Sequence, residues 1–182
     1  MIDTAEEVIL VDESDREIGT GPKLGTHRDG LLHRAFSIFL FNERGETLIQ
    51  QRADIKYHSP RKWANTCCGH PRPGETVKDA AGRRLGEELG LDIELSFGFH
   101  ARYQTVLEAG MTENEFVYIY GGLARGTPRP EPTEVADWTF ISLEKLRDAH
   151  GLERADQTIW LQHYLDKHFD ALVSLRDRIT SA

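Results

Sequence analysis

The 182-residue sequence has little of what marks secreted, zinc-thiolate or membrane-spanning proteins. Its only two cysteines, Cys67 and Cys68, are adjacent, so the sequence offers no distant pair for a loop-closing disulfide and no C-x-x-C spacing for a zinc knuckle. No stretch approaches the roughly 18 apolar residues that span a bilayer. The acidic N-terminus lacks the basic start and the apolar run of a signal peptide. We therefore expect a protein of the reducing cytoplasm that does not act in a membrane.

Positive charge is also scarce. The chain carries 22 lysines and arginines against 30 aspartates and glutamates, which gives a formal net charge of -8. This balance argues against nucleic acid or an anionic membrane surface as the main partner. An anionic small molecule would need a local basic patch or a metal ion. The length and the 39% hydrophobic content predict a single domain over residues 1–182 with a substantial core.

The order of the apolar runs predicts strands that flank two or three helices. Residues 33–53 predict a hairpin that turns at 42–45, whereas residues 57–75, with three prolines, predict a loop. Further strands are expected at 8–19, before a turn, and at 113–124. Residues 134–148 predict a strand and then a helix, and a helical period runs from 156 to 179. Because strand and helix do not alternate strictly, we expect an α/β (α+β) fold with helices packed on a mixed sheet.

A helix is predicted from about Thr76 to Gly90. Thr76 and Asp79 resemble a capping box, and Gly90 is placed to end the helix. Gly82 and Gly86 each cost about 1 kcal/mol relative to alanine inside a helix. Their presence suggests that another backbone packs closely against this segment. One apolar stripe is expected to be buried, formed by Val77, Ala81 and Leu85.

This loop and helix resemble the Nudix box over residues 69–91. Arg84 stands where the box has a glutamate. Nudix hydrolases use several box glutamates to hold the metal that activates a water, so a cation here weakens a hydrolase function. Arg84 could pair with Glu88, four residues on. We expect Glu88 to face a magnesium ion bound to a diphosphate; a solvated helix face is the alternative. The matching residues are Gly69, Glu75, Arg83, Leu85, Glu87, Glu88, Gly90 and Leu91.

Two carboxylates on a predicted strand suggest a cation site. Glu113 and Glu115 are two residues apart, so in a strand they share a face. They repel one another unless a proton or a cation lies between them. An exposed edge screened by solvent is the alternative, and periodicity does not separate the two interpretations. His27, His33 and His70 are scattered along the chain, so their spacing alone defines no metal site.

Five stretches together resemble the type 1 isopentenyl diphosphate isomerase family. They follow the family's order from about residue 23 to 120, and a sixth match lies at 158–162. The stretches are GTHRDGLLHRAFSIFLFNERGETLIQQRA, KWANTCCGHPRPGE, AAGRRLGEELG, RYQT and TENEFVYIY. The resemblance implies a Nudix-like mixed sheet sandwiched by helices, with a core at about 33–150 and an N-terminal extension. It also implies a divalent cation (manganese, magnesium or zinc) held by His27, His33, His70, Glu113 and Glu115.

The resemblance further implies that Cys68, directly before Gly-His-Pro, is the reactive thiol, whereas Cys67 is a small buried hydrophobe. The implied reaction moves a carbon–carbon double bond, from isopentenyl diphosphate to dimethylallyl diphosphate. The alkene takes one proton, passes through a carbocation-like species and loses another proton, which requires two acid/base groups. Cys68 would be one, and Glu115, in contact with the metal, the other. The order in which they act stays open.

Other matched positions are expected to serve the two ends of the substrate. Tyr103 and Trp160 match aromatic positions that stabilise a carbocation, although either could be an ordinary core residue. The Tyr103 hydroxyl could also bond to Glu115. The diphosphate, with its own magnesium ion, needs positive charge, and Arg84 would then clamp an anion that is not cleaved. The expected phosphate contacts are Lys23, Arg52, Lys56 and Arg84.

We therefore expect a monomeric isomerase. A Nudix diphosphate hydrolase is the main alternative, and it predicts phosphate release and indifference to Cys68. A catalytically idle binding module with the same fold is a third, and it would tolerate the loss of Cys68 or Glu115.

Overall fold

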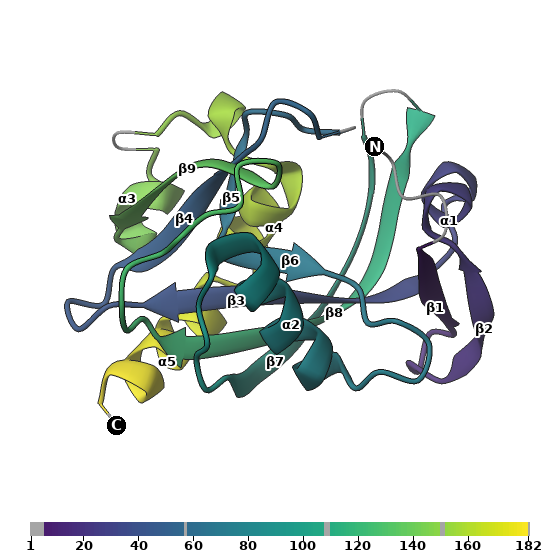
Figure 1. Cartoon of the computed structure of the whole chain (residues 1–182), viewed down its shortest axis with the longest axis horizontal. Helices are drawn as coiled ribbons and strands as arrows, with labels where there is room; N and C mark the ends of the chain where they lie inside the picture. The colour runs from purple at the N-terminus through teal and green to yellow at the C-terminus, as the bar shows by residue number, and fades with distance from the viewer. Residues whose placement is uncertain (1–5, 57, 108–109, 150–151, 182) are drawn as a thin grey trace.

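Strand β3 (His33–Phe41) organises the sheet, because other strands pair along both of its edges (Figure 1). The computed structural model describes residues 6–56, 58–107, 110–149 and 152–181. β8 (Thr112–Leu123) runs parallel to β3 along its whole length. On the other edge β3 pairs antiparallel with β6 (Cys67–Gly69), and at its start with β1 (Glu7–Val11). His33 thus lies opposite Glu115, and Ser37 lies opposite Cys68.

The remaining strands extend this mixed sheet to nine strands in the described ranges. β2 pairs with β1, β7 with β8, and both β5 and β9 with β4. Their bounds are β2 Glu17–Pro22, β4 Thr47–Arg52, β5 Trp63–Asn65, β7 Ser96–Val106 and β9 Val135–Ile141.

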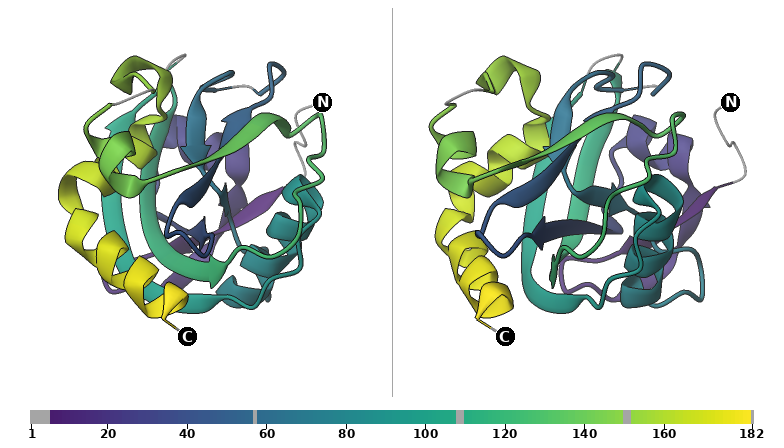
Figure 2. Two further views of the ribbon diagram at one scale, coloured as in Figure 1. Left: turned by 90° about the vertical axis from the view of Figure 1, so that its left-hand side faces the viewer. Right: turned by 60° about the vertical axis from the view of Figure 1, so that its left-hand side comes forward.

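Successive side chains of β3 enter two different cores, as a strand buried on both faces requires. Phe36, Ile38 and Leu40 pack with helix α2 (Val77–Leu89). The alternate residues, Ala35, Phe39 and Phe41, pack with α4 (Ile159–Lys167) and α5 (Phe169–Thr180). Helices therefore cover both faces of the sheet (Figures 1 and 2), and the expected sandwich is confirmed.

Helix α2 has the predicted ends. The Thr76 side chain accepts a hydrogen bond from the Asp79 backbone N–H, and Gly90 takes the left-handed conformation with φ of 62°. The close backbone approach predicted at Gly82 and Gly86 is wrong. A Cβ on Gly82 would meet nothing within 4 Å, and one on Gly86 would meet only the Leu91 carbonyl at 3.9 Å. Both glycines lie on the exposed face of the helix.

Two predictions fail around β3. The hairpin at 33–53 forms only at its turn, where Phe41 pairs with Thr47, because β6 takes the edge of β3 beyond that point. The segment 57–75, predicted to be a loop, supplies the short strands β5 and β6. β5 pairs with the preceding strand β4, whereas β6 pairs with β3, about 30 residues earlier, and the local proline content indicated neither pairing.

The remaining helices include two that the sequence did not predict, α1 (Lys23–Asp29) and the 3₁₀ turn η2 (Arg154–Asp156). The strand and helix predicted at 134–148 form as β9 and α3 (Leu143–Arg147). The long helical period is broken at His168, which separates α4 from α5. None of the helices in the described ranges combines the length and the apolar run that a bilayer crossing requires.

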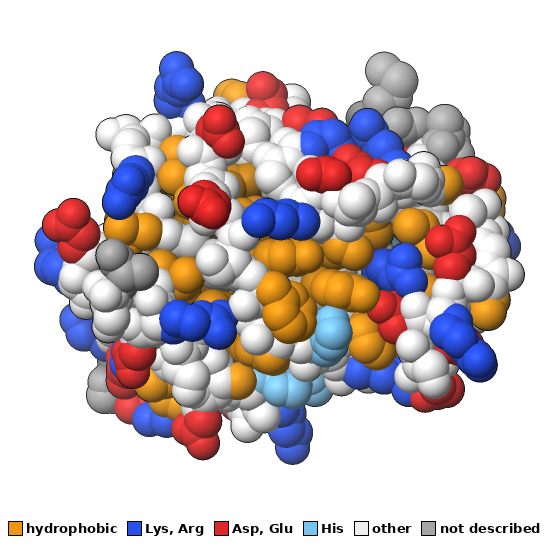
Figure 3. All heavy atoms as spheres, turned by 90° about the horizontal axis from the view of Figure 1, so that it is seen from below, with side chains coloured by type: hydrophobic (Ala, Val, Ile, Leu, Met, Phe, Trp, Pro, Cys, Tyr) orange, Lys and Arg blue, Asp and Glu red, His pale blue; other side chains and the backbone are white. Residues whose placement is uncertain are grey.

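The outward face of β7 and β8 carries a group of contacting rings from Phe97, His100, Phe116 and Tyr118. Figure 3 shows hydrophobic side chains beside histidines on the face seen from below. Because strand side chains alternate, this face is the one opposite Glu115 and Val117.

Candidate active site

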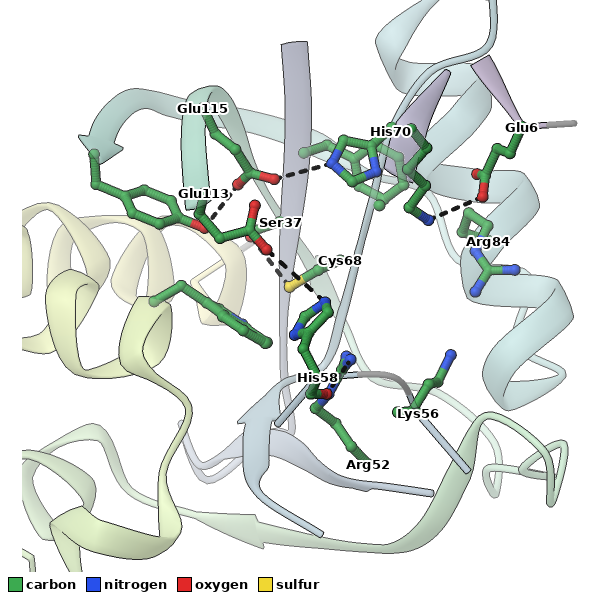
Figure 4. A pocket seen from close by; sticks show the side chains of 15 residues that line it. Glu6, Ser37, Arg52, Lys56, His58, Cys68, His70, Arg84, Glu113 and Glu115 are labelled. Carbon is green, nitrogen blue, oxygen red and sulfur yellow. Dashed lines mark hydrogen bonds and ion pairs between the residues drawn. The ribbon is translucent and has the colours of Figure 1, made fainter. Parts of the chain in front are cut away.

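A cavity of roughly 660 Å³, including the part open to solvent, brings together most of the predicted site residues (Figure 4). β6, β7, β8 and α4 contribute to its lining, as does the segment after β4. Ten predicted residues line it: Lys23, Arg52, Lys56, Cys68, His70, Arg84, Tyr103, Glu113, Glu115 and Trp160. Glu6, Ser37 and His58 also line it and were missed.

The three predicted histidines form one group behind this cavity. The ring centroids of His27, His33 and His70 lie 4.7 to 5.4 Å apart. The Nδ1–H group of His27 donates to the Lys23 backbone carbonyl at 2.7 Å, and that of His33 donates to the Leu31 backbone carbonyl at 2.8 Å. Each bond places a hydrogen on Nδ1, which leaves the Nε2 atom as the position that can bind a cation.

Both carboxylates of β8 adjoin the histidines. Glu115 Oε1 lies 3.0 Å from His70 Nε2 and 3.6 Å from His33 Nε2, while its Oε2 accepts from the Tyr103 hydroxyl at 2.8 Å. Glu113 Oε2 lies 3.2 Å from His27 Nε2. The alternation of β8 thus turns both carboxylates inward, and the exposed-edge alternative is wrong.

This group of side chains fits a divalent cation. One ligand atom each from His27, His33, His70 and Glu115 lies within 4.8 Å of the others, and Glu113 joins them through His27. His27 Nε2 and Glu113 Oε2 are buried and make no hydrogen bond within the described part of the chain. Buried polar atoms without partners are costly, whereas imidazole and carboxylate together suit zinc or manganese.

Their surroundings shift the pKa values of Glu113 and Glu115 in opposite directions. Burial and the charge of the neighbouring Glu115 raise the pKa of Glu113. Burial also acts to raise the pKa of Glu115, but its hydrogen bond with His70 and the neighbouring His33 outweigh burial and hold that pKa well below its usual value. Burial lowers the pKa of His70 to about 3. The surroundings therefore act on the two carboxyl groups in opposite directions, raising the pKa of Glu113 and lowering that of Glu115.

Cys68 presents its sulfur to the cavity from β6. Its Sγ lies 3.3 Å from Ser37 Oγ and 3.2 Å from Asn65 Oδ1. Burial raises the pKa of the Cys68 thiol to about 12, so the group is protonated at neutral pH. Cys67, its neighbour along the strand, faces the other way and is fully buried in the core under α2, as predicted.

Aromatic and imidazole rings wall the cavity near α4. Trp160 is almost fully buried, and its ring lies edge-on to His58, with 5.7 Å between centroids. The Arg52 guanidinium carbon lies 5.2 Å from the Trp160 ring centroid. His58 Nε2 lies 3.9 Å from Glu113 Oε1, and burial lowers the pKa of His58 to about 2.

The predicted phosphate contacts gather on the side of the cavity away from Glu115, where Figure 4 shows Lys56 and Arg84. Arg52 donates to the His58 backbone carbonyl at 3.2 Å. The other three pair with carboxylates: Lys56 with Glu134, and Arg84 with both Glu134, at 3.1 Å, and Glu88. Lys23 pairs with Glu6 at 2.9 Å. These three cations are therefore held in place by acidic neighbours despite the negative net charge of the chain.

Glu88 lies apart from the histidine group and does not line the cavity. It is buried, and it accepts hydrogen bonds from Gln50 Nε2 at 2.7 Å and from Arg84. The pairing of Arg84 with Glu88 that the sequence suggested is present. The solvated-face alternative is wrong for Glu88, and its magnesium role stays a prediction.

Comparison with known proteins agrees with this geometry. Residues 31–163 match the NUDIX domain family. The isopentenyl-diphosphate Delta-isomerase of Burkholderia multivorans is 46% identical over 162 residues, which cover 89% of this chain and 92% of that protein. The protein of the same name from Streptomyces griseus is 46% identical over 168 residues, which cover 90% of this chain and 84% of that protein.

Solved structures at lower identity share the fold. A protein from Deinococcus radiodurans superposes with a TM-score of 0.72 at 20% identity, covering 89% of this chain and 98% of that one. A Nudix hydrolase from M. smegmatis superposes with a TM-score of 0.59 at 16% identity, and the match covers 92% of this chain and 95% of that one. With the relatives above, these findings place the chain in the isopentenyl-diphosphate Delta-isomerase family, on a Nudix fold.

Proposed function

We propose that this chain is an enzyme that interconverts isopentenyl diphosphate and dimethylallyl diphosphate. The observation that carries the proposal is that a thiol, Cys68, and a carboxyl group, Glu115, open onto one cavity. Relatives that bear the isomerase name over most of the chain support it. Moving a double bond requires one proton to be added and another removed, and these two groups can do both.

The two groups are carried by different strands. Cys68 lies opposite Ser37 on β3, and Glu115 lies opposite His33, four residues away along the same strand. Four residues of strand span about 13 Å between Cα atoms, so the side chains reach toward the substrate from separate positions. In the forward direction one group gives a proton to the terminal alkene carbon while the other takes one from the allylic carbon. In the reverse direction their roles exchange.

Other residues would shape the reaction around this pair. The Tyr103 hydroxyl donates to Glu115 and so orients it. The faces of Tyr103 and Trp160 would stabilise positive charge on the hydrocarbon tail and exclude water. His27, His33, His70, Glu113 and Glu115 would hold a manganese, magnesium or zinc ion. When bound, such an ion supplies positive charge that favours the carboxylate form of Glu115.

The diphosphate would bind where Lys23, Arg52, Lys56 and Arg84 converge. Its negative charge can replace that of Glu6 and Glu134, which are the present partners of Lys23, Lys56 and Arg84. A second magnesium ion, bound to the diphosphate, would lie near Glu88. Because Arg84 replaces a box glutamate, this end favours holding a diphosphate over cleaving it.

Incubation with isopentenyl diphosphate and magnesium in deuterated water, followed by NMR, tests the function. We expect dimethylallyl diphosphate that carries deuterium, because the added proton comes from groups that exchange with solvent. Release of phosphate without isomer would instead indicate a Nudix hydrolase. Substrate that stays unchanged in the metal-loaded protein would indicate a binding module.

A further inference from the structure

The Cys68 thiol lies within a chain of four hydrogen-bonded side chains. The Tyr164 hydroxyl on α4 lies 3.0 Å from Ser37 Oγ on β3, which lies 3.3 Å from the Cys68 sulfur. The sulfur in turn lies 3.2 Å from Asn65 Oδ1. Tyr164, Ser37 and Asn65 are all buried, so water does not compete for these bonds.

The direction of this chain follows from Asn65. Its side-chain amide nitrogen donates to the backbone carbonyls of Ile38, at 3.0 Å, and Cys67, at 3.2 Å. The atom facing the sulfur is therefore the amide oxygen, which only accepts. The thiol must donate to Asn65, so the sulfur accepts from the Ser37 hydroxyl, and Ser37 accepts from Tyr164.

We propose that Ser37 is a positioning residue that prepares the Cys68 sulfur for proton exchange with the alkene, with Tyr164 supporting Ser37. The inference rests on the proposed function. In the forward direction with Cys68 as donor, the S–H bond breaks and leaves its electron pair on sulfur, while the π pair of the alkene forms the C–H bond at the terminal carbon. Glu115 takes the allylic proton, and the electron pair of that C–H bond becomes the new double bond. The Ser37 O–H already points at that sulfur. Its bond strengthens as negative charge develops, so it stabilises the transition state more than the resting thiol.

Strand register explains why Ser37 can serve this purpose. Ser37 and Cys68 are directly opposite one another in β3 and β6, and their side chains lie on the same face of the sheet. Ser37 is a buried hydroxyl within an otherwise apolar run of β3. A valine or alanine would pack there with no need of partners, so the hydroxyl calls for a reason beyond packing.

Steady-state kinetics of the metal-loaded Ser37→Ala enzyme test the proposal. Loss of a hydrogen bond to a charged group predicts a fall in kcat of about 10- to 100-fold, with KM for isopentenyl diphosphate within about twofold. Ser37→Thr, which keeps the hydroxyl, should recover most of the rate. Thr66→Val is the matched control, because it removes a buried hydroxyl that bonds to the Leu40 and Leu48 backbone but not to the sulfur. It should lose stability and keep kcat.

Three results would overturn the proposal: an unchanged kcat in Ser37→Ala, the same fall in kcat in Thr66→Val, or no recovery in a folded Ser37→Thr. Should Ser37→Ala fail to fold, Tyr164→Phe replaces it. We then expect a several-fold lower kcat with an unchanged KM, and an unchanged kcat would contradict the proposal.

Alkylation of Cys68 by iodoacetamide at one fixed pH separates this proposal from the function itself. Alkylation also needs negative charge on the sulfur, so we expect it to slow about tenfold in Ser37→Ala, whatever the isomerase activity. Wild-type protein that does not isomerise the substrate would refute the proposed function. Equal alkylation rates would refute the role of Ser37.

Discussion

Two adjacent cysteines have different surroundings because a strand turns them to opposite faces of the sheet. The Cys68 sulfur meets Ser37 and Asn65 at the cavity, whereas Cys67 packs with Leu85 and other apolar side chains under α2. The alternation of strand side chains, rather than the chemistry of sulfur, therefore determines which thiol can react.

Substitution of each cysteine by alanine should separate these roles. We expect Cys68→Ala to abolish turnover, because it removes one acid/base group. Cys67→Ala should retain most turnover and lose on the order of 1 kcal/mol of unfolding free energy from the small cavity. Turnover assays and chemical denaturation of both variants provide the measurement. An equal loss of turnover in the two would show that the wrong thiol was assigned.

A buried histidine, His58, predicts a pH dependence of stability. Burial lowers its pKa to about 2 in the folded protein, against 6.5 in the unfolded chain. Above pH 6.5 both states are neutral and His58 contributes nothing. Below pH 6.5 only the unfolded state takes the proton, so stability falls by about 1.4 kcal/mol per pH unit from this group.

We therefore expect metal-free wild type to lose about 1.4 kcal/mol more unfolding free energy than His58→Gln between pH 7.5 and 5.5. Urea denaturation at the two pH values measures this difference. Equal losses in the two proteins would mean that His58 is protonated in the folded state.

At the scale of elements, the sequence predicted correctly those helix ends that depend on contacts between residues close together in the chain. Helix α2 was predicted at both ends, because Thr76 and Gly90 bond within a few residues of themselves. β6 and the parallel pairing of β3 with β8 were not predicted, since their partners lie more than 25 residues away in sequence. A hairpin was predicted at β3 and β4 for the same reason: proximity in sequence favoured a pairing that β6 displaces.

The cap of α2 makes a separable contribution to stability. Thr76→Ala removes the hydrogen bond from the Asp79 N–H and should cost about 1 kcal/mol of unfolding free energy. Thr76→Ser keeps the hydroxyl and should remain near wild type. Chemical denaturation of both variants tests this, and equal stability of the two would contradict the role of the cap. Neither change should alter KM, because Thr76 does not line the cavity.

The candidate site was predictable only in part. Neither composition nor spacing could join His27, His33 and His70, and only the family resemblance did. Ser37 could have been found, because His33 and Ser37 are four apart on one strand and so share a face. For His58 no local signal exists: it lies between β4 and β5, and its neighbours Glu113 and Trp160 come from distant segments.

At the scale of the whole molecule, the sheet carries opposite charges at the two ends of one cavity. Glu113 and Glu115 meet the histidines at β8, whereas Lys56 and Arg84 meet at Glu134. Under the proposed function, a substrate with a diphosphate head and a hydrocarbon tail would meet cations at one end and acid/base groups at the other.

Metal binding should stabilise the fold, because the ligands come from α1, β3, β8 and the residue after β6. We expect manganese at about 100 times its Kd to add about 2.7 kcal/mol to the unfolding free energy of chelator-treated protein. The Tm should then rise by about 5–10 °C. His27→Gln should lose this rise, whereas the control His100→Gln, at an exposed histidine on β7, should keep it. An equal rise in both variants would place the metal elsewhere.

The pairing of a thiol with a metal-bound carboxylate is tested most directly by measuring turnover and bound metal together in Cys68→Ala and Glu115→Gln. We predict that Cys68→Ala loses turnover and keeps its metal, whereas Glu115→Gln loses turnover and most of its metal. Glu115→Gln that turns over normally with its full metal content would contradict the assignment.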